Sequence, residues 1–493
     1  MKTAFDCDKY VELQTAKISE RLSEFGEKLY LEFGGKLFDD YHASRVLPGF
    51  LPDSKLTMLC KLKDDVEVVI VINANDIAQN KLRADVGITY DEDVLRLYDV
   101  LTGRGLYVGS IVVSQFSPQN TSAVKFIAKL KGHGIKVYRH YNIEGYPQNI
   151  ANIVSKDGFG KNEYVETSRR IVVVTAPGPG SGKMATCLSQ MYHDAQRGIK
   201  SGYAKFETFP VWNLPLNHPV NIAYEAATAD LNDVNMLDPY HMQAYGQPAV
   251  NYNRDVEVFP VLNAIFTKVL GTSPYKSPTD MGVNMAGFCI TDQEACAEAC
   301  RQEIIRRYLS AKVLARKGVV SPSVVEKLEL TMTKMNLTEN DRSVVVAARN
   351  YAKKSGSHAA AIELPDGKIV VGKTSQLLGC DSAMILNALK ALAGLPDVKL
   401  IAPSALEPIQ QLKTKILGDP VAELHVDEAL LALSVSAAVN PLAELALKEL
   451  PKLRGLQVHS TVIPPHSDDK LFYKLGIQPT ADPIYATKRV YFS

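Results

Sequence analysis

The stretch that decides the fold class is Ile171-Val172-Val173-Val174-Thr175-Ala176-Pro177-Gly178-Pro179-Gly180-Ser181-Gly182-Lys183-Met184. Its first five residues are an apolar, β-branched run, which predicts a buried strand. A glycine-rich loop follows, and helical spacing then runs from Lys183 to about Arg197, where Gly198 ends the pattern. Strand, glycine-rich turn and helix in this order are typical of a parallel α/β sheet.

The same alternation extends outward from this stretch in both directions. Short apolar runs predict strands, and runs with helical spacing between them predict helices that cover the sheet. Strands are expected at 66–72, 107–116, 135–138 and 203–209, and helices at 91–101 and from Ser117-Pro118 to Gly132.

The second half of the chain changes character twice. Residues 210–285 are rich in Pro, Asn, Asp and Tyr with little periodicity, which predicts long connections with room for short strands. Residues 292–352 almost lack glycine and predict three helices, with a linker at 353–357. Beyond it, Pro365-Asp366-Gly367 predicts a hairpin, followed by helices at 381–393, 426–438 and 441–450 and strands at 399–402 and 457–463.

These patterns predict a multidomain α/β protein. We expect a P-loop-like α/β domain at 1–230 and an irregular connection or small α+β insert at 231–290. A helical segment should occupy 291–354. The last domain, 355–493, has the order of elements of the cytidine-deaminase-like fold.

The composition limits the kinds of molecule that the protein is expected to bind. The 55 Lys and Arg residues balance 54 Asp and Glu residues, which argues against nucleic acid or an anionic membrane surface as a partner. No apolar run approaches the roughly 20 residues of a membrane span, and the first residues lack a signal-peptide pattern. We expect a soluble, cytoplasmic protein whose seven scattered cysteines are reduced.

The glycine-rich loop has the chemistry of an anion site. Glycines let consecutive N–H groups turn toward one point, and the following helix and a lysine add positive charge. The residues expected to cradle phosphate are Gly178, Gly180, Ser181, Gly182 and Lys183.

The loop departs from the P-loop pattern at two positions. Gly182-Lys183 matches, but Pro177 stands at the leading glycine and Met184 at the Ser or Thr that holds magnesium. Methionine is a poor ligand for a hard cation. If Mg²⁺ is used, Ser181 or Thr186 could reach the ion in place of Met184, and Asp76 after the first strand is the expected acidic ligand. A purely structural turn, with Lys183 in solvent, is the alternative.

Several loop residues are candidates for handling a substrate. Asp39, His42 and Arg45 bring titratable groups together beside Pro48-Gly49 and are the expected catalytic residues. We expect them near the carboxyl ends of the parallel strands, where open α/β sheets bind ligands. Weaker candidates of the same kind are Arg83, Asp85, Asn213, Asn217 and His218.

The sequence lacks the residues that two kinds of zinc enzyme need. A zinc deaminase needs a Glu two residues after its first ligand and then Pro-Cys-x-x-Cys, but Cys380 is followed by Ser382 and no later cysteine. None of the ten histidines begins His-Glu-x-x-His, so the zinc-protease motif is missing. We therefore do not expect zinc.

The chain resembles one bacterial family of uncharacterised proteins. The resemblance covers nearly the full length and includes Leu37-Phe38-Asp39-Asp40-Tyr41-His42-Ala43-Ser44-Arg45-Val46-Leu47-Pro48-Gly49 and the segment 176–184. It implies a P-loop-type α/β half, a helical segment and a deaminase-like α/β domain. Some members are labelled ATP-dependent zinc proteases, but the resemblance supplies no established catalytic residue.

The leading hypothesis is an ATP-using ligase or phosphotransferase that acts on a small polar metabolite. ATP or another phosphate-containing ligand would be its cofactor, and positioning and charge neutralisation would supply most of the catalysis. The rival is a non-catalytic nucleotide-binding or assembly protein, which Met184 favours. In either case we expect a homo-oligomer.

Overall fold

The computed structural model describes residues 3–83, 87–419 and 421–487, and they form two compact units. The N-terminal unit contains residues up to 228 together with 232–300. The C-terminal unit contains 229–231 and the residues from 301 onward. The chain passes from one unit to the other within helix α13 (Gln293–Arg316).

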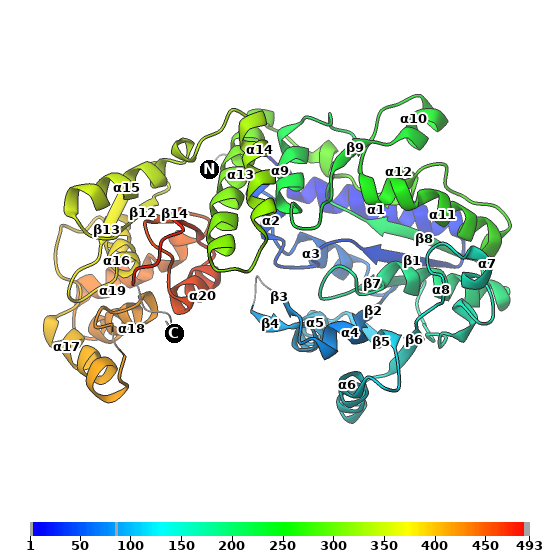
Figure 1. Ribbon diagram of the computed structural model, residues 1–493, viewed down its shortest axis with the longest axis horizontal. Coiled ribbons are helices and arrows are strands. Elements are labelled where there is room, and N and C mark those ends of the chain that lie inside the picture. The colour runs from blue at the N-terminus through cyan, green and yellow to red at the C-terminus, as the bar shows by residue number, and fades with distance from the viewer. Residues whose placement is uncertain (1–2, 84–86, 420, 488–493) are drawn as a thin grey trace. The chain divides into compact units, whose positions relative to one another are not determined.

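A seven-stranded sheet forms the centre of the N-terminal unit (Figure 1). Every neighbouring pair in it is parallel, which confirms the expected large parallel sheet. In spatial order its strands are β11 (Gly282–Val283), β8 (Ser201–Phe206), β1 (Lys28–Phe33), β7 (Ile171–Thr175), β2 (Val66–Asn73), β5 (Tyr107–Phe116) and β6 (Val137–Tyr141).

Helices cover both faces of this sheet. Helix α8 (Lys183–Gln196) packs on β1, β7 and β8, and α11 (Asn253–Leu270) packs on α8. Alternate strand residues such as Tyr30 and Val172 share one core with these helices, while the intervening Leu31 and Val173 are equally buried on the other face. Other helices against the strands include α1 (Cys7–Phe25), α4 (Ala74–Ala78), α5 (Tyr90–Gly103) and α6 (Thr121–Gly132).

The strand order creates a topological switch point beside β7. From β1 the chain runs through α2 (Tyr41–Val46) and α3 (Ser54–Lys61) to β2, on the far side of β7. From β7 it runs through α8 to β8, in the opposite direction across the sheet. Open α/β sheets bind ligands where neighbouring connections diverge in this way.

The segment 210–285 is more regular than its sequence suggests. It contains the 18-residue helix α11, whose pattern is interrupted by Pro260 and was not expected. Besides β11, the remaining elements in this part are α9 (Pro219–Ala227), α10 (Pro239–Tyr245), α12 (Pro278–Met281) and the antiparallel pair β9 (Asn235–Leu237) and β10 (Val250–Tyr252).

Three local expectations in the N-terminal unit were wrong. Strand β6 runs over Val137–Tyr141 rather than 135–138. Helix α6 begins at Thr121 rather than at Ser117-Pro118, because the side chain of Asn120 accepts the hydrogen bond from the Ala123 N–H. Strand β8 ends at Phe206, three residues before the expected end at 209. Shorter elements of this unit are β3 (Leu82–Arg83), β4 (Ile88–Thr89), α7 (Ile150–Ile153) and the 3₁₀ turns Phe159–Lys161 and Ala286–Cys289.

The helical segment forms as expected, with one correction. After α13 come α14 (Pro322–Lys334), a 3₁₀ turn at Glu339–Asp341 and α15 (Ser343–Ser355). The expected linker at 353–357 is largely helix, because α15 continues to Ser355 and ends at Gly356, whose φ is 67°.

A separate mixed sheet forms the centre of the C-terminal unit, as expected. Its spatial order is β13 (Ile369–Lys373), β12 (Ala359–Glu363), β14 (Gln457–Ser460) and β15 (Gln478–Ala481), and only the last pair is parallel. No strand forms at 399–402. The remaining helices are α16 (Cys380–Leu392), α17 (Pro403–Gln411) with a π turn at Leu412–Ile416, α18 (Val426–Ala437), α19 (Pro441–Lys448) with a 3₁₀ turn at Leu450–Leu453, and α20 (His466–Leu475).

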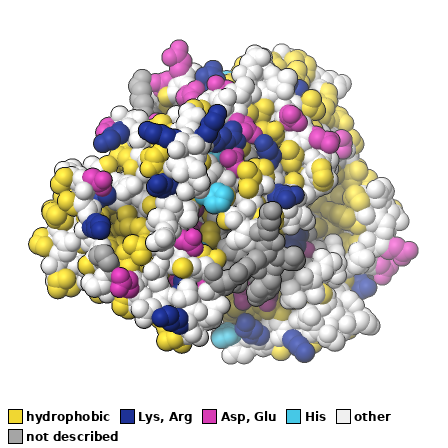
Figure 2. Space-filling model, turned by 60° about the vertical axis from the view of Figure 1, so that its left-hand side comes forward, with side chains coloured by type: hydrophobic (Ala, Val, Ile, Leu, Met, Phe, Trp, Pro, Cys, Tyr) yellow, Lys and Arg dark blue, Asp and Glu magenta, His cyan; other side chains and the backbone are white. Residues whose placement is uncertain are grey.

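The surface and the helices give two further observations. Basic and acidic side chains are interspersed over the face drawn in Figure 2. Among the residues that the structure describes, no helix has the length and apolar character needed to cross a bilayer.

Candidate functional site

The glycine-rich loop, residues 176–182, lies over the carboxyl edge of the large sheet. It leaves β7, which is flanked by β1 and β2, and leads directly into α8 at Lys183. Gly180 and Gly182 adopt φ values of 76° and 91°, in the left-handed region that side chains disfavour. The loop therefore follows a backbone path that requires glycine at these two positions.

Side chains from two neighbouring strands hold the carbonyl groups of the loop. Asn73, at the end of β2, donates to the Gly180 carbonyl at 3.3 Å, and Ser114 on β5 donates to the Ser181 carbonyl at 2.6 Å. Because the C=O and N–H of a trans peptide point in opposite directions, the next two N–H groups turn away from these strands. Within 3–83, 87–419 and 421–487, the N–H groups of 181–184 meet no hydrogen-bond acceptor.

Lys183 is the first residue of α8 and is partly exposed. Burial lowers the pKa of its amine, the nearby charge of Lys205 lowers it further, and Glu32 opposes both effects. Its amine forms no ion pair or hydrogen bond with the described residues. Within the described part of the chain, a half-buried lysine without a counter-ion thus begins the helix whose first N–H groups are unbonded.

Gly178 has no room for a side chain, because Tyr90 lies close to its backbone. A Cβ at this position would lie 2.2 Å from the hydroxyl of Tyr90, the first residue of α5. Ser181, which is fully buried, donates its hydroxyl to the Gly178 carbonyl at 2.8 Å. The loop is therefore held from inside and from the adjacent helix.

The expected substrate residues lie after the carboxyl end of β1, next to β7 in the sheet. Asp39 has a φ of 60° and accepts a hydrogen bond from Arg96 at 2.8 Å. The His42 ring meets Phe209 edge-on, with centroids 5.1 Å apart, and so joins the segments that follow β1 and β8. Arg45 lies in the same short helix, α2.

Asp76 lies on α4, one turn beyond β2. Its Oδ1 accepts from Lys81 at 3.1 Å, while its buried Oδ2 has no hydrogen-bond partner among the described residues. Among all the residues that the structure describes, no three His, Cys, Asp or Glu side chains come together as a metal-binding group. A dedicated protein cage for Mg²⁺ therefore does not fit the side chains around Asp76.

A buried charge network that the sequence did not reveal continues from the loop along the same edge. Glu32 is in register with Val174 of β7 and with Lys205 of β8, and it accepts a 2.6 Å hydrogen bond from Tyr203. The Lys205 amine forms an ion pair with Asp255. Because these partners lie far apart in sequence, only the positions of Glu32 and Lys205 near strand ends could have hinted at them.

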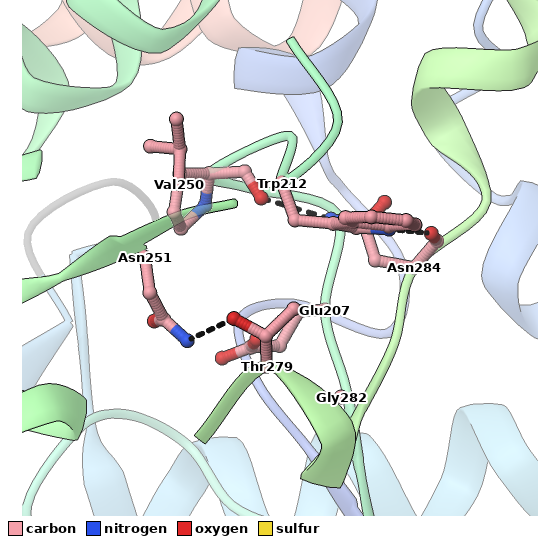
Figure 3. Close-up of a pocket in the computed structure, with 8 residues that line it drawn as sticks. Glu207, Trp212, Val250, Asn251, Thr279, Gly282 and Asn284 are labelled. Atoms are coloured by element: carbon pink, nitrogen blue, oxygen red, sulfur yellow. Dashed lines mark hydrogen bonds between the residues drawn. The ribbon is translucent and has the colours of Figure 1, made fainter. Parts of the chain in front are cut away.

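Glu207 follows β8 directly and extends this network to a pocket (Figure 3). It receives a 2.7 Å contact from the Lys205 amine. Burial and the carboxylate of Asp255 raise the pKa of Glu207 to about 7, against the opposing effect of Lys205. The pocket is lined by Glu207, Pro210, Trp212, Val250, Asn251, Thr279, Gly282 and Asn284.

The weaker loop candidates have other surroundings. Arg83 pairs with Asp93 at 2.8 Å, and His218 caps α9 and contacts Gln293 at 3.0 Å. Asn213 stands beside Trp212, and Asn217 is exposed. Asp85 lies outside the described residues.

The C-terminal unit holds a second group of buried polar side chains. Asp381, on the first turn of α16, accepts a hydrogen bond from Ser460, and burial raises its pKa to about 6. His459 on β14 contacts Thr480 at 3.0 Å and Asp482 at 3.4 Å. This part of the chain likewise contributes no group of three metal-binding side chains among the residues described.

Comparison with known proteins matches nearly the whole chain to one protein family. The model for the N-terminal part of a domain of unknown function, DUF1846, matches residues 3–336, and the model for its C-terminal part matches 340–491. A UPF0371 protein of Corynebacterium urealyticum is 55% identical over 488 residues, covering 99% of this chain and 98% of the relative. One of Streptococcus pyogenes serotype M5 is 54% identical over 493 residues, covering all of both. The chain therefore belongs to the bacterial DUF1846 family.

Proposed function

We propose that the N-terminal unit binds the phosphate groups of a nucleotide such as ATP at the glycine-rich loop. The observation that carries this proposal is that, among the described residues, neither the Lys183 amine nor the N–H groups of 181–184 have a hydrogen-bond or ion-pair partner. Backbone N–H groups at a helix start, together with a lysine, are a frequent means of binding phosphate. Gly178, Gly180 and Gly182 let the backbone come close to the ligand.

The loop in this proposal is a variant of a P-loop. Lys183 keeps the usual lysine position, whereas Pro177 cannot donate and Met184 cannot bind a hard cation. Mg²⁺, if it accompanies the nucleotide, would be held mainly by the phosphates and water, with Asp76 as the proposed carboxylate. No catalytic step is assigned to the ion.

The proposed activity is that of a ligase or phosphotransferase acting on a small polar metabolite. Two facts support a reaction rather than storage of a nucleotide. The loop lies at a topological switch point, and the edge it shares with Glu32, Lys205 and Glu207 offers groups that could hold a second reactant. Asp39, His42 and Arg45 are proposed to handle the substrate from the neighbouring segment after β1.

A non-catalytic nucleotide-binding protein is the second candidate. Met184 favours it, because the Ser or Thr at that position normally helps to hold the metal that phosphoryl transfer uses. For the C-terminal unit we propose a likeness to the deaminase fold alone, based on its hairpin followed by α16.

The test is a thermal-shift screen of the full chain with nucleotides and inorganic phosphates, with and without Mg²⁺. Lys183→Ala should abolish the stabilisation by phosphate ligands. Lys136→Ala is the matched control, because Lys136 is exposed and precedes β6 at the opposite edge of the sheet.

The outcomes separate the candidates. A shift that requires Mg²⁺ and is accompanied by nucleotide turnover supports the enzyme. A shift without Mg²⁺ and without turnover supports the non-catalytic binder. If no phosphate compound raises the melting temperature of the wild type, both are contradicted.

A further inference from the structure

The pocket beside Glu207 is narrow and lies within the N-terminal unit (Figure 3). Its space is about 260 Å³ when counted out to the open solvent, and the enclosed part has room for one group of the size of water or ammonium. Figure 3 shows Asn251 reaching toward Thr279 and Glu207, with Trp212 and Asn284 across the space. The pocket therefore fits the head of a small ligand.

Glu207 presents one free carboxylate oxygen. Its Oε1 receives the Lys205 amine at 2.7 Å and the Tyr252 hydroxyl at 3.3 Å. Its Oε2 forms no hydrogen bond with any described residue. A Cβ on Gly282 would stand 3.5 Å from Oε2, so this oxygen faces a wall of the pocket that has no side chain.

The charges around the pocket leave it negative. Lys205 is the cation in contact with two carboxylates, since its amine pairs with both Asp255 and Glu207. When Glu207 is ionised, these three groups carry a net charge of about −1, which is costly at a buried place. The raised pKa of Glu207 agrees with this imbalance.

Most of the hydrogen-bond donors in the wall are already engaged. The Trp212 indole N–H donates to the Asn284 carbonyl at 2.9 Å, and the Thr279 hydroxyl donates to Asp238 at 2.7 Å. The Asn251 amide donates to Thr279 at 3.5 Å.

The side-chain amide of Asn284 donates hydrogen bonds to two backbone carbonyls, those of Thr208 and Pro210. The pocket thus offers the free Oε2 of Glu207 and the indole of Trp212, both of which favour a cation that donates hydrogen bonds.

We propose that this pocket binds a primary ammonium group. The group is carried by a small amine-bearing metabolite or is ammonium itself, because both present the same N–H donors and positive charge. This inference extends the proposed function by naming the chemical class of the second reactant. The test of amine binding uses no phosphate ligand, so the two proposals can fail separately.

The protein carries its own probe, because Trp212 is the only tryptophan in the chain and lines the pocket. The full-length protein is titrated with ammonium, methylammonium and ethanolammonium chlorides at about pH 8, where Glu207 is mainly ionised, and tryptophan fluorescence is recorded. Potassium and tetramethylammonium chlorides at equal ionic strength are the comparisons.

Saturable fluorescence changes with ammonium or the primary amines, and none with tetramethylammonium, are expected. Glu207→Gln should weaken binding about ten-fold or more, as the loss of a charge-assisted hydrogen bond would. Glu166→Gln, at an exposed glutamate, should leave binding unchanged. Tighter binding of an amine than of ammonium identifies the metabolite as the source.

Three results would overturn the proposal. One is equal response to tetramethylammonium or potassium, which would remove the need for N–H donors. Another is no saturable response of the wild type to any of the amines. The third is unchanged binding in Glu207→Gln. If this variant does not fold, the pH profile of the wild type replaces it, since amine binding should weaken below about pH 7.

Discussion

Ser114 Oγ, on β5, donates a 2.6 Å hydrogen bond to the carbonyl oxygen of Ser181 in the glycine-rich loop. The two residues are 67 positions apart in sequence, and both are buried. Strand β5 is separated from β7 by β2, so this bond ties the loop across the sheet. It fixes the peptide whose N–H belongs to Gly182, at the centre of the proposed phosphate site.

Replacing Ser114 by alanine should therefore weaken phosphate binding more than folding. We expect an affinity about three- to ten-fold lower, the usual effect of losing one hydrogen bond that positions a binding group. Ser110→Ala is the matched control, because Ser110 lies on the same strand and its buried hydroxyl has no partner among the described residues. Equal affinities of the two variants, measured by calorimetric titration, would contradict the role given to Ser114.

Gly182→Ala should combine a loss of stability with a loss of binding. The φ of 91° and a contact of 3.0 Å with Ser114 Oγ make a side chain costly here, by about 1–2 kcal/mol. Gly134→Ala has comparable strain, since its φ is 75°, but there is open space around it and it follows α6. Both variants should melt at lower temperature, yet only Gly182→Ala should lose its response to phosphate.

The buried pair of Asp40 and Lys55 should be a main contributor to the stability of the N-terminal unit. The Lys55 amine lies 2.7 Å from Asp40 Oδ2, and its side chain is 2% exposed. Asp40→Asn keeps an oxygen to cap α2 but leaves the lysine unpaired, so the free energy of unfolding should fall by about 3–5 kcal/mol. Denaturant unfolding at neutral pH measures this loss.

Acid should reduce the difference between this variant and the wild type. Burial raises the pKa of Asp40, but the charge and hydrogen bond of Lys55, with smaller contributions from His42 and the Ala43 N–H, together outweigh it and lower the pKa. A lowered pKa contributes stability above the unfolded value near 4, and that contribution disappears as the pH falls through the folded value. A difference that stays constant down to about pH 2 would contradict the assignment of the lost stability to this ion pair.

Asp468 should give the C-terminal unit the opposite pH dependence. Burial, and then the charge of Asp381, raise the pKa of Asp468 to about 8, so the folded unit holds a proton that the unfolded chain releases near pH 4. The free energy of unfolding should therefore fall as the pH rises from about 4 to 8. Asp468→Asn, which keeps an acceptor for the Val426 N–H, should flatten this dependence and stabilise the unit at pH 8 by about 1–3 kcal/mol.

Thermal unfolding at several pH values tests this assignment. Asp366→Asn in the turn between β12 and β13 is the control, because Asn can still accept from the Lys368 N–H. An Asp468→Asn curve that falls with pH as steeply as the wild-type curve would show that another group is responsible.

The parallel sheet could be predicted where burial acts on uniform apolar strands. The runs that became β2, β5 and β7 are apolar and rich in β-branched residues. Strand β1 was missed because Lys28 and Glu32 interrupt its pattern, although both are buried. Their partners, Thr167 for Lys28 and Tyr203 for Glu32, are more than a hundred residues away and cannot be read from local spacing.

The candidate site was predictable only in its local part. Glycines and a lysine before a helix can be recognised along the chain. The hydrogen bonds from Asn73 and Ser114 to the loop, however, depend on strand order. Glu207 carries no local signal, since its raised pKa arises from burial and from Asp255, on a helix that begins 46 positions later at Asn253. Long-range pairing of charges is therefore the part of the site that the sequence concealed.

The central claim is that the loop before α8 binds phosphate through Lys183 and its backbone N–H groups. Calorimetric titration of the full-length wild type, Lys183→Ala and Lys136→Ala with ATP and with inorganic tripolyphosphate tests it most directly. The account predicts saturable binding to wild type and Lys136→Ala that weakens as salt is added, and a loss of about ten-fold or more in Lys183→Ala. Equal affinities of Lys183→Ala and the wild type, or no binding of either compound to the wild type, would contradict it.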